Sequence, residues 1–229
     1  DRKFVGVEAL CRLNHPRLGT ITPERFIDKA EESELILHIT LAVFKQAFTD
    51  WNKWKKMGLN IKLSINVSPV NVQQPEFADN VLSLISEYNI PANKLCLEIT
   101  ENILADNQLQ ELSNLSRLNM HGIDIALDDF GKDHATIDRL RKLPLNSVKL
   151  DKSYFLDQSH SLRQMELLNT SIALAEKLQL MTYAEGVETK EAMALAAEVN
   201  CNYAQGYFIA HPLQAKDVLL WAHEWHKKI

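Results

Sequence analysis

Apolar and polar residues alternate in seven short segments of this chain, a pattern typical of β-strands. In chain order the segments are 4–10, 61–67, 94–99, 123–128, 147–151, 180–185 and 202–206. The stretches between them repeat apolar residues every three or four positions, as amphipathic helices do. Helices are therefore expected at 25–32, 39–57, 76–88, 106–120, 136–141, 161–178, 189–199 and 215–226. Strands that alternate with helices in this way predict parallel βαβ units.

The number of strands and the length of the chain favour a closed barrel. At 229 residues a modified TIM-like (β/α)8 barrel of the α/β class is a more natural outcome than an open sheet. We therefore expect one domain that covers residues 1–229. A barrel of this type has eight strands. The domain is expected to be N-terminally incomplete, with its first strand missing just upstream of Phe4.

Composition narrows the classes of function. A net charge of −5 and a pI near 5.9 argue against a protein that binds long nucleic acid through a basic face, although a small anionic ligand stays open. No apolar run approaches the roughly 18 residues of a membrane span. The three cysteines are far apart, which favours reduced thiols over a disulfide or a zinc site. We expect a cytoplasmic domain, whose parent protein could be anchored in a membrane.

Polar side chains stand at the end of every predicted strand. In barrels of this class the catalytic side chains come from these C-terminal strand ends. The residues at these ends are Glu8, Asn66, Glu98, Asp128, Asp129, Lys149, Asp151, Glu185 and Gln205. If the strands close into a barrel, these side chains meet at one rim.

Five of these residues are carboxylates, and like charges gathered at one rim require cations. They are Glu8, Glu98, Asp128, Asp129 and Glu185. Because the set contains oxygen ligands and neither His nor Cys, it favours Mg²⁺ or Mn²⁺ over Zn²⁺. Two such ions are a recurring device for hydrolysing phosphodiesters, in which Lys149 would orient water or offset negative charge. The plainer alternatives are a lysine that only pairs with a carboxylate and an Asp-Asp pair that only forms a solvated turn.

Seven short motifs along the chain resemble, in order and spacing, those of the EAL domain, a family of bacterial phosphodiesterases that act on cyclic di-GMP. The motifs are Glu8-Ala9-Leu10-Cys11-Arg12, Asn66-Val67-Ser68-Pro69, Leu97-Glu98-Ile99-Thr100-Glu101, Asp128-Asp129-Phe130-Gly131, Val148-Lys149-Leu150-Asp151, Ala184-Glu185-Gly186-Val187-Glu188-Thr189 and Gln205-Gly206-Tyr207.

The resemblance implies a role for each matching residue. One metal ion would be bound by Glu8, Asn66, Glu98 and Asp128, and a second by Asp128, Asp129 and Glu185. The implied catalytic residues are Lys149, Glu185 and Glu8, with Lys149 contacting the catalytic water. Arg12 and Gln205 match positions that bind substrate, and Glu101, Asp151 and Glu188 are supporting residues. The implied product is linear pGpG. The implied partners are cyclic di-GMP, a second copy in a homodimer, and flanking regulatory domains of a parent protein.

The sequence departs from the family after Asp128-Asp129. The family usually has Thr-Gly-Tyr-Ser-Ser after the shared Phe-Gly, whereas residues 132–136 of this chain read Lys-Asp-His-Ala-Thr. Loss of the second glycine narrows the conformations open to this loop. The alternative to an efficient phosphodiesterase is therefore a receptor that binds cyclic di-GMP with weak or no turnover. A purely structural domain fits less well, because the full ligand set is present. The resemblance implies that the strand expected upstream of Phe4 corresponds to the family's first strand, which is antiparallel to its neighbour.

Overall fold

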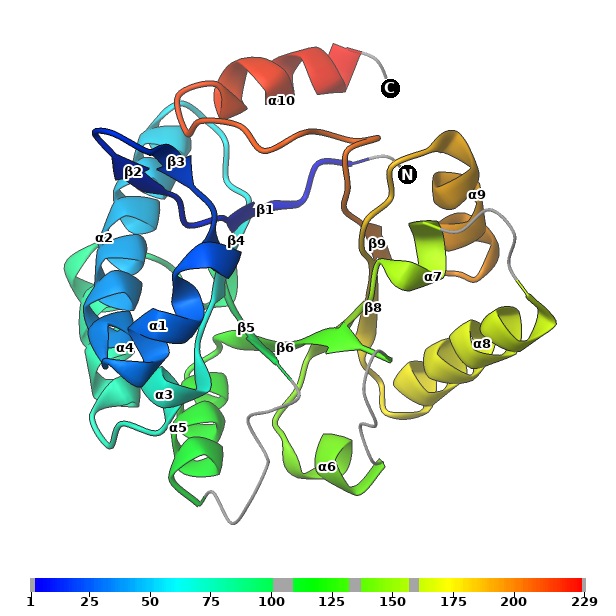
Figure 1. Ribbon diagram of the computed structural model, residues 1–229, viewed down its shortest axis with the longest axis horizontal. Helices are drawn as coiled ribbons and strands as arrows, with labels where there is room; N and C mark the ends of the chain where they lie inside the picture. The colour runs from blue at the N-terminus through cyan, green and yellow to red at the C-terminus, as the bar shows by residue number, and fades with distance from the viewer. Residues whose placement is uncertain (1–2, 101–108, 132–136, 157–160, 228–229) are drawn as a thin grey trace. The chain divides into compact units, whose positions relative to one another are not determined.

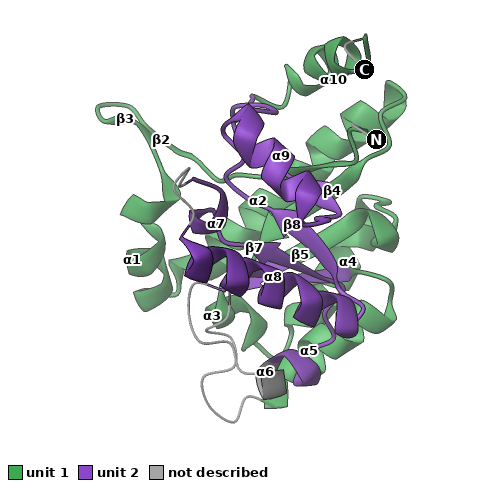
Figure 2. Cartoon of the chain, turned by 90° about the vertical axis from the view of Figure 1, so that its right-hand side faces the viewer, with its two compact units in different colours: residues 1–97, 108–123, 214–229 green, residues 98–107, 124–213 purple. Residues whose placement is uncertain are grey.

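The structure is a computed structural model that describes residues 3–100, 109–131, 137–156 and 161–227 (Figure 1). The chain divides into two compact units (Figure 2). Unit 1 consists of Asp1–Leu97, Gln108–Ile123 and Gln214–Ile229. Unit 2 consists of Glu98–Asn107 and Asp124–Leu213.

Unit 1 carries the first strands of the sheet, in the order β1-β4-β5. They are β1 (Gly6–Ala9), β4 (Lys62–Asn66) and the first half of β5 (Leu95–Thr100). β1 and β4 run parallel, with Glu8 opposite Ser64. Within the unit the helices are α1 (Ile27–Glu32), α2 (Leu35–Lys56), α3 (Pro69–Val72), α4 (Phe77–Glu87), α5 (Leu109–Met120) and α10 (Val218–Lys227). Short 3-10 turns, η1 (Pro23–Arg25) and η2 (Ala92–Lys94), complete it.

The long helix α2 forms much of the core of unit 1. Its buried side chains include Phe44, Phe48, Trp51 and Trp54, which recur at helical spacing as the sequence predicted. The indole of Trp51 donates a hydrogen bond of 2.9 Å to the carbonyl of Ile61, immediately before β4. Burial of such large rings, with the polar N–H satisfied, fixes the helix against the strand.

A two-stranded antiparallel sheet that the sequence analysis did not predict follows β1. It consists of β2 (Leu13–His15) and β3 (Gly19–Ile21). Gly19 has a φ of 71°, which a residue without Cβ adopts readily. Leu13 and Leu18 are exposed here, so the burial signal that marks the strands of the main sheet is missing from this hairpin.

Unit 2 carries the remaining strands, in the order β5-β6-β7-β8-β9. The strands β6 (Asp124–Phe130), β7 (Ser147–Leu150), β8 (Met181–Ala184) and β9 (Tyr203–Ala204) follow, and the pairs β6–β7, β7–β8 and β8–β9 are parallel. Its helices are α6 (Ile137–Lys142), α7 (Ser153–Leu156), α8 (Leu162–Lys177) and α9 (Lys190–Glu198). Ser161 begins α8 with a capping box, and the Thr189 hydroxyl accepts from the Ala192 N–H at the start of α9.

All seven predicted strands are present, and the predicted helices are present with shifted ends. Helix α2 begins at Leu35, earlier than expected. The expected helix at 25–32 is split into η1 and α1. The predictions for Glu101, for the start of the helix at Asp106 and for the loop at 132–136 lie outside the described residues.

A helix that crosses a bilayer must be long and almost wholly apolar. Among the residues that the structure describes, no helix combines the length and the apolar character needed to cross a bilayer.

Candidate active site

The Asp128-Asp129 pair sits at an irregularity near the end of β6. Leu127 lies opposite Val148 on β7, but three residues later Phe130 lies opposite Leu150, so β6 holds one extra residue. Asp129 itself has a left-handed φ of 55°, and its N–H donates a hydrogen bond of 2.9 Å to Asp128 Oδ1. Neighbouring residues of a regular strand point to opposite faces. The bulge and the left-handed residue redirect the second side chain, so both carboxylates can serve one site.

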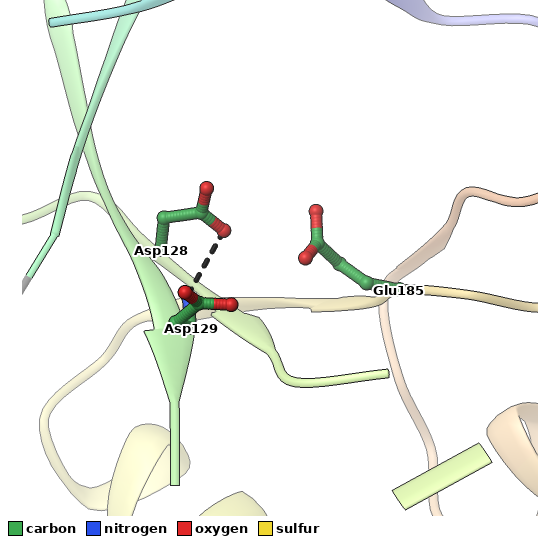
Figure 3. A group of neighbouring side chains, drawn as sticks. All are labelled: Asp128, Asp129 and Glu185. Carbon is green, nitrogen blue, oxygen red and sulfur yellow. Dashed lines mark hydrogen bonds between the residues drawn. The ribbon is translucent and has the colours of Figure 1, made fainter. Parts of the chain in front are cut away.

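These two carboxylates share a cluster with Glu185, which directly follows β8 (Figure 3). Asp128, Asp129 and Glu185 each offer an oxygen that lies within 4.8 Å of the other two. All three side chains are partly buried. We call this group the acidic cluster.

Lys149, on β7, binds the acidic cluster from within unit 2. Its side chain is only 2% exposed. Its Nζ lies 2.7 Å from Glu185 Oε1 and 3.5 Å from Asp128 Oδ1. A third contact, of 2.7 Å, joins it to Oε2 of Glu98 on β5, which is 3% exposed. A buried ammonium group needs such partners, because desolvation is costly for an unpaired charge.

The donor set of the acidic cluster suits a hard divalent cation. Two oxygens on opposite sides of one bound Mg²⁺ or Ca²⁺ are about 4–5 Å apart, which matches the spread of the cluster. The single ammonium group of Lys149 lies within 4 Å of three carboxylates, those of Glu98, Asp128 and Glu185, so these four side chains together carry an excess of negative charge. A divalent ion would balance that excess, and oxygen ligands favour Mg²⁺ or Mn²⁺. Asp128, Asp129 and Glu185 could therefore hold a metal ion.

Three further predicted residues belong to unit 2. Asp151 is 5% exposed, and its carboxylate accepts a hydrogen bond of 2.9 Å from the Ser153 N–H at the start of α7. Gln205 follows β9, and its N–H donates to the Ala184 carbonyl at 2.8 Å, beside Glu185. Glu188 is exposed. Asp151 therefore has a local role in the turn after β7, and Gln205 is fixed by its backbone to the end of β8.

The other predicted residues belong to unit 1. The amide of Asn66, at the end of β4, donates a hydrogen bond of 2.6 Å to Glu8 Oε1 on β1. The two strand ends that the sequence singled out are therefore brought together. Arg12 is exposed and its guanidinium donates to the Cys11 carbonyl at 2.7 Å.

Comparison with known proteins decides the family. The sequence profile of the EAL domain matches residues 1–212. The chain belongs to the EAL domain family. The resemblance of the seven motifs is thereby confirmed over most of the sequence.

Relatives of this EAL domain include two proteins of Pseudomonas aeruginosa. The cyclic di-GMP phosphodiesterase RocR is 32% identical over 216 residues, which are 94% of this chain and 55% of RocR. The cyclic di-GMP phosphodiesterase PA2567 is 33% identical over 219 residues, which are 96% of this chain and 37% of PA2567. The EAL domain described here thus spans only part of the length of these relatives.

A solved structure agrees with this assignment. The phosphodiesterase MucR, in a complex with c-di-GMP, superposes with a TM-score of 0.88 at 29% identity. The superposition covers 93% of this chain and 87% of the chain in that structure. It confirms the α/β fold class, of the TIM-like barrel type, that the sequence predicted.

One residue of unit 2 escaped the sequence analysis. Tyr154, in α7, packs on Gly131 at the end of β6 and donates a hydrogen bond of 3.3 Å to its carbonyl. The available signal was indirect: a glycine follows Asp128-Asp129-Phe130, and an aromatic residue follows Lys149 at a short interval. Neither feature identifies the partner, because the contact depends on the turn after β7.

Proposed function

We propose that this EAL domain is a metal-dependent phosphodiesterase that hydrolyses cyclic di-GMP to linear pGpG. The observation that carries the proposal is the acidic cluster joined to the buried ammonium group of Lys149. The names of RocR and PA2567 support cyclic di-GMP as the substrate, and MucR was solved with that nucleotide bound. The chemistry of the cluster and the names of the relatives therefore point to the same reaction.

The residues of the site would have different roles in hydrolysis. In the reaction a water oxygen forms a bond to phosphorus, the bond from phosphorus to one ribose oxygen breaks, and that oxygen leaves with a proton. When bound, two Mg²⁺ or Mn²⁺ ions would lower the pKa of water and polarise the phosphoryl oxygens. The acidic cluster holds negative oxygens ready for those ions. Lys149, fixed between Glu98 and Glu185, would orient the attacking water and offset charge that develops on the phosphoryl group.

The remaining assignments rest on the sequence motifs. We propose that Glu8, Asn66 and Glu98 are further metal ligands, and that Arg12 and Gln205 bind the substrate. Glu101, Asp151 and Glu188 are proposed as supporting residues. We further propose that the domain acts in the cytoplasm as a homodimer, beside regulatory domains of a longer parent protein, since the relatives are longer than this chain.

A second candidate function follows from the loop sequence. Residues 132–136 lack the second glycine of the family, and Lys132 and Ala135 stand where the family has small hydroxyl residues. A receptor that binds cyclic di-GMP without efficient hydrolysis would have the same ligand set and a loop that no longer supports turnover.

One experiment separates the two candidates. Purified protein is incubated with cyclic di-GMP and Mg²⁺ or Mn²⁺, and the nucleotides are separated by chromatography, while binding is measured in Ca²⁺. The phosphodiesterase produces pGpG. Binding without product favours the receptor, and neither binding nor product refutes both. Chelation of the metal should abolish product formation in the first case.

A further inference from the structure

We infer that Tyr154 is a positioning residue for the acidic cluster, acting through Gly131. The inference rests on the proposed function, since it concerns how the chain holds its metal ligands in place. Tyr154 would act through the main chain and not by contact with the reacting groups. It contacts the backbone that presents Asp128 and Asp129, and its neighbour Lys152 contacts the backbone that presents Glu185.

The contact between Tyr154 and Gly131 is close. Tyr154 is 8% exposed, and Gly131 comes directly after β6 with a φ of 95°. A Cβ added to Gly131 would lie 2.7 Å from Cε2 of the Tyr154 ring, closer than side-chain carbons approach one another. The Tyr154 hydroxyl also donates to the Gly131 carbonyl. The ring therefore limits where the chain can run just after Asp128-Asp129.

A matching contact lies on the other side of the acidic cluster. Gly186 directly follows Glu185 and has a φ of 61°. A Cβ on Gly186 would lie 3.2 Å from the Cα of Lys152 and nearer still to its Cβ. The segment of residues 152–154 thus packs against two glycines: Gly131, which follows Asp128 and Asp129, and Gly186, which follows Glu185. It can set the separation between Glu185 and the two aspartates.

The segment itself is held by hydrogen bonds to the end of β7 and β6. The Asp151 N–H donates to the Phe130 carbonyl at 3.2 Å, and the Asp151 carboxylate accepts from the Ser153 N–H at 2.9 Å. The Tyr154 N–H then donates to the Asp151 carbonyl at 3.1 Å. These hydrogen bonds fix the segment to the ends of β6 and β7, so it is well suited to act as a rigid spacer.

The conformation of Asp129 explains why such a spacer is needed. A non-glycine residue with a φ of 55° is disfavoured, and it persists only where its surroundings leave no alternative. Asp129 stands two residues before Gly131. If the ring of Tyr154 were removed, the end of β6 could relax, and the oxygens of Asp128 and Asp129 would no longer be held in place for an ion.

Binding of Mn²⁺ alone, measured by electron paramagnetic resonance on the intact chain, tests the inference. Tyr154→Leu should weaken Mn²⁺ binding by about tenfold or more, the range seen when supporting contacts around a metal site are lost. Tyr154→Phe keeps the ring and should retain binding close to that of the unchanged protein. Phe155→Leu is the matched control, because it truncates a ring 3% exposed on the same helix. The control should bind Mn²⁺ normally.

The outcomes separate this inference from the proposed function. Normal Mn²⁺ binding by a folded Tyr154→Leu would overturn the role of Tyr154 and leave the phosphodiesterase intact, provided that the unchanged protein produces pGpG. An equal loss in Phe155→Leu would also overturn it, because the effect would be general destabilisation. If thermal melting shows that Tyr154→Leu is unfolded, Tyr154→Met decides by the same criterion. Absence of Mn²⁺ binding and of cleavage in the unchanged protein would overturn both proposals.

Discussion

Replacing Lys149 with Met is the most informative perturbation of the site's electrostatics. Met has a similar length and no charge, so the variant removes the ammonium group with little loss of volume. The carboxylate of Glu98 is 3% exposed and would lose a partner at 2.7 Å. Glu185 would lose a partner at the same distance, although it is 18% exposed and can be hydrated more easily.

The expected loss of stability in Lys149→Met is large because the charges that Lys149 contacts are buried. Two opposite unit charges about 2.7 Å apart attract by about 6 kcal/mol at an effective dielectric constant of about 20, but desolvation offsets much of this. Removing one partner of a buried ion pair typically costs about 3–5 kcal/mol, because the other charge stays buried and loses its opposite charge. In a domain of this size each kcal/mol lowers the melting temperature by about 2–4 °C. Lys149→Met should therefore melt about 6–20 °C below the unchanged protein when metal is chelated.

Thermal unfolding followed by circular dichroism measures this difference. The matched control is Lys177→Met, an exposed lysine in the last turn of α8, which should change stability by less than about 0.5 kcal/mol. Added Mn²⁺ should reduce the deficit of Lys149→Met, because the ion supplies positive charge to the same carboxylates. A melting temperature for Lys149→Met within the error of the control, in chelator, would refute the claim that Lys149 balances buried negative charge.

Three further predictions concern other residues. If Glu8 is a metal ligand, Glu8→Gln should lower the rate of pGpG formation by more than about a hundredfold. The control Glu191→Gln changes an exposed residue of α9 and should leave the rate unchanged. Equal rates for the two variants would show that Glu8 is not a metal ligand. Restoring Thr at Lys132 and Gly at Asp133 should raise turnover measured by chromatography, because the loop regains conformational freedom; no gain would show that this loop does not limit the reaction. Glu111 lies in α5 and is 1% exposed, and this burial raises the pKa of its carboxyl group. The side chain of Gln73 lowers the pKa by a smaller amount. The folded protein therefore binds this proton more tightly than the unfolded chain, and the resulting stability is lost as the pH rises through the raised pKa. Glu111→Gln should stabilise the protein by about 1 kcal/mol at pH 8 and by less at pH 4 in urea denaturation, and an equal effect at both pH values would contradict the assignment.

The strands of the main sheet could be predicted from the sequence because their pattern of apolar residues indicates that they are buried. Strand β7, for example, is buried along its whole length, and its apolar residues stand out between polar turns. The hairpin of β2 and β3 lacked such a signal, since its strands are three residues long and largely exposed. One-turn helices such as α7 were missed for a related reason: four residues are too few to show a helical period.

The sequence predicted which residues form the candidate site better than it predicted their geometry. The position of Asp128, Asp129 and Glu185 at strand ends indicated that they would meet, and the structure brings them together. The extra residue in β6 and the left-handed Asp129 were not predictable, because a shift in register against β7 depends on strand pairing that the local sequence does not show. For Lys149 the sequence left open a role with water or a plain ion pair. The structure shows the ion pairs, which are compatible with both.

The acidic cluster is proposed to hold divalent ions at which cyclic di-GMP is cleaved. A crystal structure of the protein with cyclic di-GMP and Mn²⁺, with anomalous scattering recorded at the manganese edge, tests it most directly. We predict manganese peaks within about 2.0–2.4 Å of oxygens from Asp128, Asp129 and Glu185, next to a phosphate of the nucleotide. Nucleotide bound with no manganese at these carboxylates, or manganese bound only elsewhere, would contradict the account.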